Sequence, residues 1–421
     1  MWLPLPPAPR LVLLAAALML AGAPAPAPAQ AKPRARDLGI QLPGTPGPED
    51  AITDVPGVEV GQSTLISGDG RLIRGKGPVR TGVTAVFPRG KRSSDPVFAG
   101  HFALNGNGEM TGIHWLAESG FLWGPVVITN TMSVGVVRDA AIAWMLRQGW
   151  DGFLISLPVV AETWDGTLND IEGMHVKPAD VFRALDGASG GRVAEGNVGG
   201  GTGMICHRFK GGIGTASRKL SAEAGGYTVG VLVQCNYGQR SRLSVLGAPV
   251  GREIADLLPC NTLAGGAERL PPCAQSGATA PGAASDDNGS GSIIIVIATD
   301  APLMPHQLDR LARRAALGVG RMGGLGEDSS GDLFVSFSTA NPGASADTGT
   351  VRLTMLPNDR INPLFEATVG ATEEAILNAL LAADTMTGAD GNRVYALPVD
   401  RLLAVLRKYG RMSEDQPAER P

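Results

Sequence analysis

The sequence predicts one large α/β domain in which helices are layered on β-sheet. Short apolar runs rich in β-branched residues alternate along the chain with stretches of helical spacing and with glycine-rich turns. The chain has 421 residues, 43% of them hydrophobic, so it can bury a large core. We detect no internal repeat that would divide it.

The first residues are typical of a targeting segment. Arg10 precedes the apolar run from Leu11 to Leu20, and Ala27-Pro28-Ala29 matches a small-residue cleavage site. The run is shorter than the roughly 20 apolar residues that a transmembrane helix needs. We therefore expect residues 1–29 to be a signal peptide and the mature protein to be periplasmic or secreted, with no membrane attachment once the signal is removed.

The first half of the mature chain alternates between the two element types. Gly or Pro bounds most of the strand candidates, and an Asn-Gly pair in the turn from Leu104 to Gly112 predicts a tight hairpin. The elements expected are strands at Asp54 to Ser63, Gly82 to Arg89, Val126 to Thr129 and Phe153 to Ala161, and helices at Asp139 to Leu146 and Pro178 to Leu185.

The Gly199 to Gly203 run invites a nucleotide-binding interpretation, but it lacks the Lys-Ser/Thr ending of a P-loop, so we interpret it as a structural turn. The strand expected from Thr228 to Cys235 ends at Asn236. A side-chain amide at that position is a candidate oxyanion donor or an ordinary turn residue.

The rest of the chain is organised around one stretch, Asn288 to Asp300. Its first half has loop composition, and Ile293 to Ala298 is a continuous apolar run typical of a strand covered on both faces. Ser292 stands at the junction of the two. The elements expected after it are helices at His306 to Arg321, Thr372 to Ala383 and Asp400 to Tyr409, and strands at Leu333 to Ser338 and Val351 to Leu356.

Charge and cysteine content exclude several classes of function. The formal charge is −4, and no basic stripe indicates a nucleic-acid or membrane-surface partner. The Cys and His spacings fit no zinc site, so we expect neither metal nor cofactor. Cys260 and Cys273 lie in a loop-like segment and could close a small disulfide ring. Cys206 and Cys235 lie in or beside strand-like runs and are interpreted as buried thiols.

The position of Ser292 suggests an N-terminal nucleophile. A serine hydroxyl needs a base, and an α-amino group with a pKa of about 7.7–8.0 can supply it if the Gly291–Ser292 bond breaks. The hydroxyl of Ser292 could make that cut itself by attacking the carbonyl of Gly291. Ser290 is the rival cleavage point, and a flexible Gly/Ser linker is the alternative without chemistry.

Four further residues are candidates for the same site. Ser330 and Asp332 alternate at the start of a strand, where they could hold the ammonium or hydroxyl of Ser292, or simply form a turn. Glu162 and Trp164 follow an apolar strand, where they could line a pocket or form a solvated strand end.

These residues together resemble the family of L-aminopeptidase/D-amidase-esterases and β-peptidyl aminopeptidases, which are self-cleaving N-terminal-nucleophile (Ntn) hydrolases. The resemblance covers nearly the whole mature chain and rests on six separated motifs in the same order: Arg80 to Val86, Leu104 to Gly112, Glu162 to Gly166, Asn236 to Gly238, Ser292 to Leu303 and Ser330 to Asp332.

The resemblance implies a four-layer αββα sandwich and a precursor cut into an α chain, residues 30–291, and a β chain, residues 292–421. It assigns the nucleophile to Ser292, a supporting serine and acid to Ser330 and Asp332, and the oxyanion donor to Asn236. Some relatives carry Glu where this chain has Asp332.

The resemblance also gives the substrate-binding residues: Glu162 receives the free amine of the substrate, and Trp164 lies beside it. We expect an exported serine aminopeptidase acting on small peptides, amides or esters through an acyl-enzyme on Ser292, as a homo-oligomer. β- and D-amino-acid substrates are both open. The alternatives are an acyltransferase on a related self-cleaving scaffold and a non-cleaved exported binding protein.

Overall fold

A computed structural model describes residues 32–150, 155–263, 270–273 and 291–413. The expected signal peptide and the rival cleavage point Ser290 lie outside these residues. Every element below belongs to the unit that begins at Pro33. Among the helices of the described residues, none combines the length and the apolar character that a membrane span requires.

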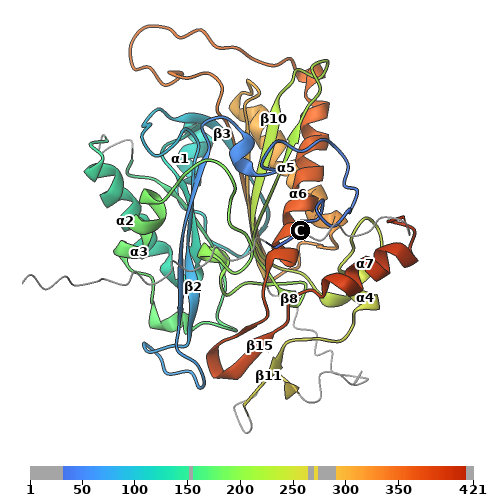
Figure 1. Cartoon of the computed structure of the whole chain (residues 1–421). Coiled ribbons are helices and arrows are strands. Elements are labelled where there is room, and N and C mark those ends of the chain that lie inside the picture. Colours follow the sequence, from blue (N-terminus) through green and yellow to red (C-terminus); the bar gives the residue numbers. More distant parts are fainter. Residues whose placement is uncertain (1–31, 151–154, 264–269, 274–290, 414–421) are drawn as a thin grey trace, which may run out of the picture. The chain divides into compact units, whose positions relative to one another are not determined.

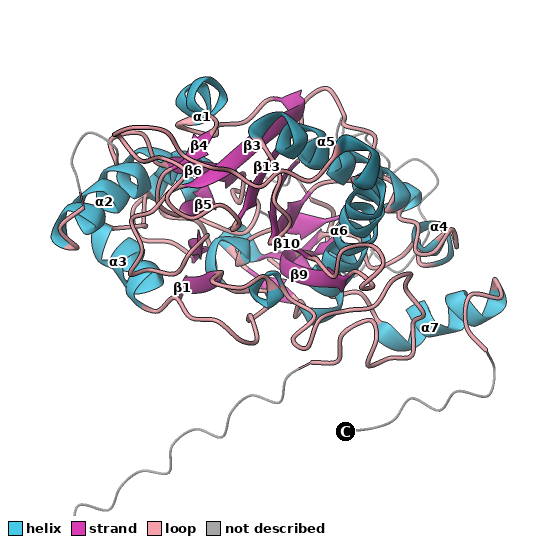
Figure 2. Ribbon diagram, turned by 90° about the horizontal axis from the view of Figure 1, so that it is seen from above, coloured by secondary structure: helices cyan, strands magenta, loops and turns pink. Residues whose placement is uncertain are grey.

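Two β-sheets form the centre of this unit (Figure 2). The first has the strand order β1-β2-β5-β6, and the second has the order β4-β3-β13-β12-β10-β9. Pairing is antiparallel except for β5 with β6 and β12 with β13. The strand bounds are β1 Glu59–Ser67, β2 Val79–Phe87, β3 Val97–Gly106, β4 Phe121–Leu122, β5 Val126–Asn130, β6 Val159–Thr163, β9 Gly212–Lys219, β10 Thr228–Asn236, β12 Ser292–Thr299 and β13 Gly331–Ser338.

Helices cover the outer face of each sheet. The helices α2 (Val134–Arg147) and α3 (Pro178–Asp186) pack on the first sheet. The helices α5 (Pro305–Arg321) and α6 (Asn362–Ala382) pack on the second (Figure 1). A separate apolar cluster fills the space between the sheets. The predicted four-layer αββα sandwich is therefore confirmed.

The strand β12 shows how the sequence encodes this layering. Its odd positions Ile293, Ile295 and Ile297 belong to the cluster that contains the helices α5 and α6. Its even positions Ile294 and Val296 belong to the cluster between the sheets. Both faces are covered, which explains an unbroken apolar run. By the same alternation the side chain at position 292 faces the space between the sheets.

The remaining elements surround this sandwich. They are the helices α1 Ile113–Ser119, α4 Val250–Glu253 and α7 Val399–Lys408, and the short strands β7 Ile205–Cys206, β8 Phe209–Lys210, β11 Cys260–Asn261, β14 Met386–Thr387 and β15 Asn392–Val394. Single turns of 3₁₀ helix occupy Ile52–Asp54, Thr131–Ser133, Ile171–Gly173, Gly199–Gly201, Arg240–Arg242, Asn358–Arg360 and Ala389–Gly391. The Gly199 segment is a turn, as predicted.

Two local predictions were wrong. Residues 351–356 form no strand, and Leu353 is 42% exposed, so the apolar residues of this segment are not buried as those of a core strand would be. The Asn-Gly pair does not make a tight hairpin. Instead β3 runs through Asn105 to Gly106, and α1 intervenes before β4 pairs with β3.

Other elements exist but have different bounds. The strand expected at Phe153 to Ala161 is β6, Val159–Thr163, so Glu162 lies within the strand rather than after it. The helix expected from Thr372 begins at Asn362. Its early turns are buried on nearly all sides, which removes the amphipathic pattern that marks a surface helix.

The interpretation of Cys206 and Cys235 as free thiols was also wrong, because the structure joins them in a disulfide. Their separation of 29 residues in the sequence gave no signal of pairing. The expected ring between Cys260 and Cys273 is present.

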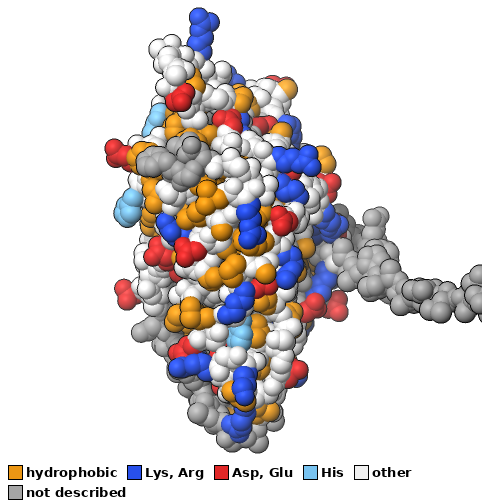
Figure 3. Space-filling model, turned by 90° about the vertical axis from the view of Figure 1, so that its left-hand side faces the viewer, with side chains coloured by type: hydrophobic (Ala, Val, Ile, Leu, Met, Phe, Trp, Pro, Cys, Tyr) orange, Lys and Arg blue, Asp and Glu red, His pale blue; other side chains and the backbone are white. Residues whose placement is uncertain are grey.

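Figure 3 shows the surface on the side of α1, α2 and α3, where positive and negative side chains are interspersed with hydrophobic ones.

Candidate active site

Ser292 is the first residue of β12 and is 6% exposed. Strand pairing places it between Asn236 of β10 and Gly331 of β13. Its hydroxyl donates to the carbonyl oxygen of Gly291 at 2.7 Å. The backbone N–H of Gly331 is shared between the Oγ of Ser292 and that same carbonyl oxygen, at 3.2 Å each. The hydroxyl, the Gly291–Ser292 bond and a hydrogen-bond donor are thus already together.

Gly291 is required by a close approach of two backbones. A Cβ at this position would lie 2.4 Å from the carbonyl oxygen of Asn236 and 2.8 Å from the Cα of Tyr237. These are backbone atoms of a core strand and of the residue after it, so they cannot move aside cheaply. The preference for glycine before the nucleophile therefore has a packing cause.

Ser330 and Asp332 form a buried pair on the neighbouring strand. The hydroxyl of Ser330 donates to Oδ1 of Asp332 at 2.6 Å. Burial raises the pKa of Asp332 to about 6; the hydroxyl of Ser330 and the N–H of Ile293 oppose this rise, and Glu327 adds to it. Because Asp332 pairs with Ile293 in the parallel ladder, it lies one position from the nucleophile.

In the uncut chain the hydroxyl of Ser292 contacts the backbone between these two residues, and the predicted role of the pair in holding the ammonium of Ser292 stays a prediction. Of the described residues, the one that donates to the Oγ of Ser292 is Gly331, which lies between Ser330 and Asp332 in the sequence. The pair therefore borders the nucleophile without a direct hydrogen bond to its hydroxyl in the uncut chain.

Asn236 is held at both ends of its side-chain amide. The backbone N–H of Ile205 donates to Oδ1 at 2.7 Å, and Nδ2 donates to the carbonyl oxygen of Trp164 at 2.9 Å. An amide nitrogen carries two hydrogens. One remains to donate to an oxyanion beside Ser292, which is the strand partner of Asn236.

Glu162 is buried at the end of β6, with 3% exposure. Its Oε1 accepts a hydrogen bond from the N–H of Glu109 at 2.9 Å, and its Oε2 accepts one from the hydroxyl of Thr131. A Cβ atom at Gly108 would lie 3.3 Å from Oε1 of Glu162 and 3.2 Å from the Cα of Gly331. Glu162 is therefore close to the strand that flanks the nucleophile.

Trp164 is 40% exposed, and its indole lies against Gly166. Its backbone carbonyl, rather than its ring, joins it to the site through Asn236. The structure therefore brings together Ser292, Gly291, Asn236, Ser330, Asp332 and Glu162. A role for the Trp164 ring beside the substrate stays a prediction.

Sequence reasoning missed the hydrogen bonds that orient these groups. Three of the donors are the backbone N–H groups of Gly331, Ile205 and Glu109, and the residue type at a position does not show that its backbone N–H orients a site. Thr131 could have been found, because it follows the strand β5, which pairs in parallel with the strand carrying Glu162. Side chains at the same ends of parallel neighbours lie close together.

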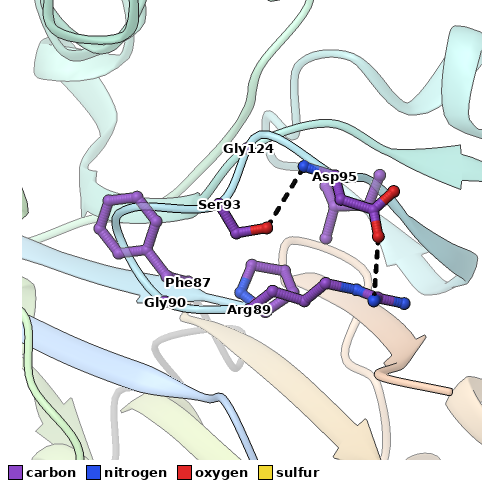
Figure 4. A pocket seen from close by; sticks show the side chains of 8 residues that line it. Phe87, Arg89, Gly90, Ser93, Asp95 and Gly124 are labelled. Atoms are coloured by element: carbon purple, nitrogen blue, oxygen red, sulfur yellow. Dashed lines mark hydrogen bonds and ion pairs between the residues drawn. The ribbon is translucent and has the colours of Figure 1, made fainter. Parts of the chain in front are cut away.

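Two cavities within the described part of the chain lie away from these residues. One, with a volume of about 10 Å³, is bordered by Phe87, Arg89 and Asp95 (Figure 4). Since Val86 pairs with Val126, this end of the sheet is opposite Glu162. The other cavity, of about 270 Å³, is lined by charged residues of the segment 34–50 and by Arg192. Within the described ranges, no cluster of His, Cys, Asp or Glu could hold a metal ion.

Comparison with known proteins gives consistent matches over most of the chain. The model of peptidase family S58 matches residues 50–394. The β-peptidyl aminopeptidase BapA of Sphingosinicella microcystinivorans is 55% identical over 385 residues, covering 90% of this chain and 93% of that protein. BapA of Sphingosinicella xenopeptidilytica is 49% identical over 382 residues, covering 89% and 91%.

Solved structures match equally widely. The L-aminopeptidase D-Ala-esterase/amidase of Ochrobactrum anthropi, described as a variant of the Ntn hydrolase fold, has a TM-score of 0.79 and 46% identity over 91% of this chain and 100% of its own. A β-aminopeptidase of a Burkholderia species has a TM-score of 0.76 and 47% identity, covering 90% and 99%.

Proposed function

Because the chain belongs to peptidase family S58 and is a serine aminopeptidase with an Ntn-type fold, we propose that it is made as a precursor. In this proposal the precursor cuts its own chain before Ser292. The contact between the Ser292 hydroxyl and the Gly291 carbonyl, 2.7 Å between the two oxygens, carries the proposal. Attack of Oγ on that carbonyl carbon breaks the peptide bond and forms an ester, while the proton passes to the leaving nitrogen. Water then hydrolyses the ester.

The N–H of Gly331 is the group that supports this first reaction. It already donates to the carbonyl oxygen of Gly291, on which negative charge develops during attack. The same N–H contacts Ser292 Oγ and so keeps the hydroxyl beside its target. The cut gives an α chain ending at Gly291 and a β chain beginning at Ser292.

The new amino group of Ser292 is proposed as the base for substrate hydrolysis. It takes the hydroxyl proton as Oγ attacks the substrate carbonyl, and then gives that proton to the leaving amine. The remaining Nδ2 hydrogen of Asn236 stabilises the oxyanion. Water then releases the acyl group from Ser292. The buried pair Ser330 and Asp332 accepts a hydrogen bond from the amino group and holds it beside Oγ.

Glu162 is proposed to bind the free ammonium of the substrate. Its carboxylate is held by Thr131 and by the N–H of Glu109, so its position is set before the substrate arrives. Two of the relatives are named β-peptidyl aminopeptidases. We propose that substrates with an N-terminal β-amino acid are among those this enzyme cleaves.

We propose that the enzyme is exported after removal of residues 1–29. The test of both cuts is a denaturing gel of the purified protein, followed by N-terminal sequencing of each band. We expect one chain that begins near Gln30 and one that begins Ser-Ile-Ile-Ile.

The Ser292→Ala variant should remain one full-length band and lose peptidase activity, whereas the matched Ser290→Ala variant should be cut and active. A Ser292→Ala protein that is still cut at this bond contradicts self-cleavage by that hydroxyl. If Ser290→Ala abolishes the cut while Ser292→Ala does not, the nucleophile is Ser290 instead.

A further inference from the structure

One turn, residues 204–211, is bonded to the end of β10 that carries Asn236. We name it the supporting turn. Three consecutive residues of this turn are each bonded to one of three consecutive residues around Asn236. These bonds are the N–H of Ile205 to Oδ1 of Asn236 at 2.7 Å, the disulfide of Cys206 with Cys235, and the N–H of His207 to the carbonyl oxygen of Tyr237 at 2.7 Å.

The side chain of Lys210 links backbone carbonyl groups of the supporting turn to one another and to Gly201. Its Nζ is fully buried and donates to the carbonyl oxygens of Met204 at 2.7 Å, Gly211 at 2.8 Å and Gly201 at 3.3 Å. Burial lowers the pKa of Lys210 to about 7, and the charge of Asp165 opposes this shift. Burying an ammonium group costs free energy unless its hydrogens are bonded. Here they are used to hold three carbonyl groups in one place.

The supporting turn decides which way the Asn236 amide points. Since an N–H occupies the Oδ1 side, the other end of the amide must be the donating NH₂ group. That group donates to the carbonyl oxygen of Trp164 and retains one hydrogen for the reaction. If the turn shifted, the N–H of Ile205 would leave Oδ1, and the amide could rotate away from the oxyanion.

We propose that Lys210 and the Cys206–Cys235 disulfide are positioning residues, which act through the supporting turn to hold Asn236 as the oxyanion donor. Neither is a catalytic residue, because neither reaches the reacting atoms. The inference rests on the proposed function, in which Asn236 stabilises the oxyanion formed during substrate hydrolysis.

The test is a double-mutant cycle on kcat. The Lys210→Met variant keeps an unbranched stem but loses the three donors, and the paired substitution Cys206→Ala/Cys235→Ala removes the disulfide. Each is made in the native protein and in an Asn236→Ala background. Activity is normalised to the amount of two-chain protein on a gel. Where Asn236→Ala slows processing, the precursor is incubated until two-chain protein has formed before kcat is measured.

Loss of one oxyanion donor lowers kcat by about 10² to 10³ fold, which is the result expected for Asn236→Ala. In the positioning variants the amide of Asn236 is displaced rather than removed, so kcat should fall by less than in Asn236→Ala. We expect each positioning variant to lower kcat about 10-fold or more, with KM nearly unchanged. In the Asn236→Ala background the same changes should cost less than about 2-fold, because the amide they orient is already absent.

The chain supplies a matched control, because Cys260 and Cys273 form a second disulfide. Its replacement by alanine should leave kcat unchanged. Equal losses from the positioning variants in both backgrounds would reduce their role to general stability and overturn the inference. Unchanged kcat in both positioning variants would do the same. An Asn236→Ala enzyme with full kcat would instead refute the proposed role of Asn236 itself.

Discussion

Replacing Asp332 by asparagine should stabilise the fold while removing activity. Asp332 is 1% exposed, and burial raises the pKa of its carboxyl group from the ordinary 3.8 to about 6. Folding therefore favours its neutral form. Each pKa unit corresponds to about 1.36 kcal/mol, so above pH 6 the ionised group costs the folded state about 3 kcal/mol at most.

The pH dependence follows from the direction of this shift. A group whose pKa is raised by folding contributes stability that is complete below pH 3.8 and is lost as the pH rises through about 6. The free energy of unfolding of the native sequence should therefore fall between pH 4 and 6, relative to the Asp332→Asn variant, and run parallel to it above pH 7. Other titrating groups contribute equally to both proteins and cancel in the difference.

Urea unfolding at pH 4, 5, 6 and 7 measures this difference. Both proteins should carry Ser292→Ala, so that each is expected to remain a single chain and can be analysed as one transition. We expect the Asp332→Asn protein to gain about 1–3 kcal/mol between pH 4 and 7 relative to its parent. A difference that is constant with pH, or that shrinks as the pH rises, would refute the assignment of a raised pKa to this buried carboxyl group.

The remaining predictions concern activity and processing. The pH profile of kcat/KM should rise near 8 as the α-amino group of Ser292 becomes neutral. It should also rise below about 6 as Asp332 ionises, because the ammonium of Ser292 beside this carboxyl group lowers the pKa that burial raises; a profile without the lower step would contradict the role of Asp332. Glu162→Gln should lower kcat/KM for free-amine peptides about 10- to 100-fold, measured against N-acetylated analogues, whose slow turnover should not change. Gly291→Ala would place a Cβ 2.4 Å from the carbonyl oxygen of Asn236, so uncut precursor should accumulate on a gel; cutting at the native rate would show that the backbone adapts.

The sequence by itself determined the parts of this protein that are encoded locally. An unbroken run from Ile293 to Ala298 indicates burial on both faces, because every position of such a strand must be apolar. The serine before that run, and the residue pair Ser330 and Asp332 at the start of another strand, could be recognised by the same local reasoning. The helices α5 and α7 were also marked by amphipathic spacing.

Only the tertiary structure decided how these residues are oriented. Gly331, Ile205 and Glu109 act through backbone N–H groups, which every residue except proline has, so no residue type marks them. The pairing of Cys206 with Cys235 likewise depends on how a turn meets the end of β10. Strand pairing joins segments far apart in the chain, and the hydrogen bonds that it creates have no counterpart in local sequence pattern.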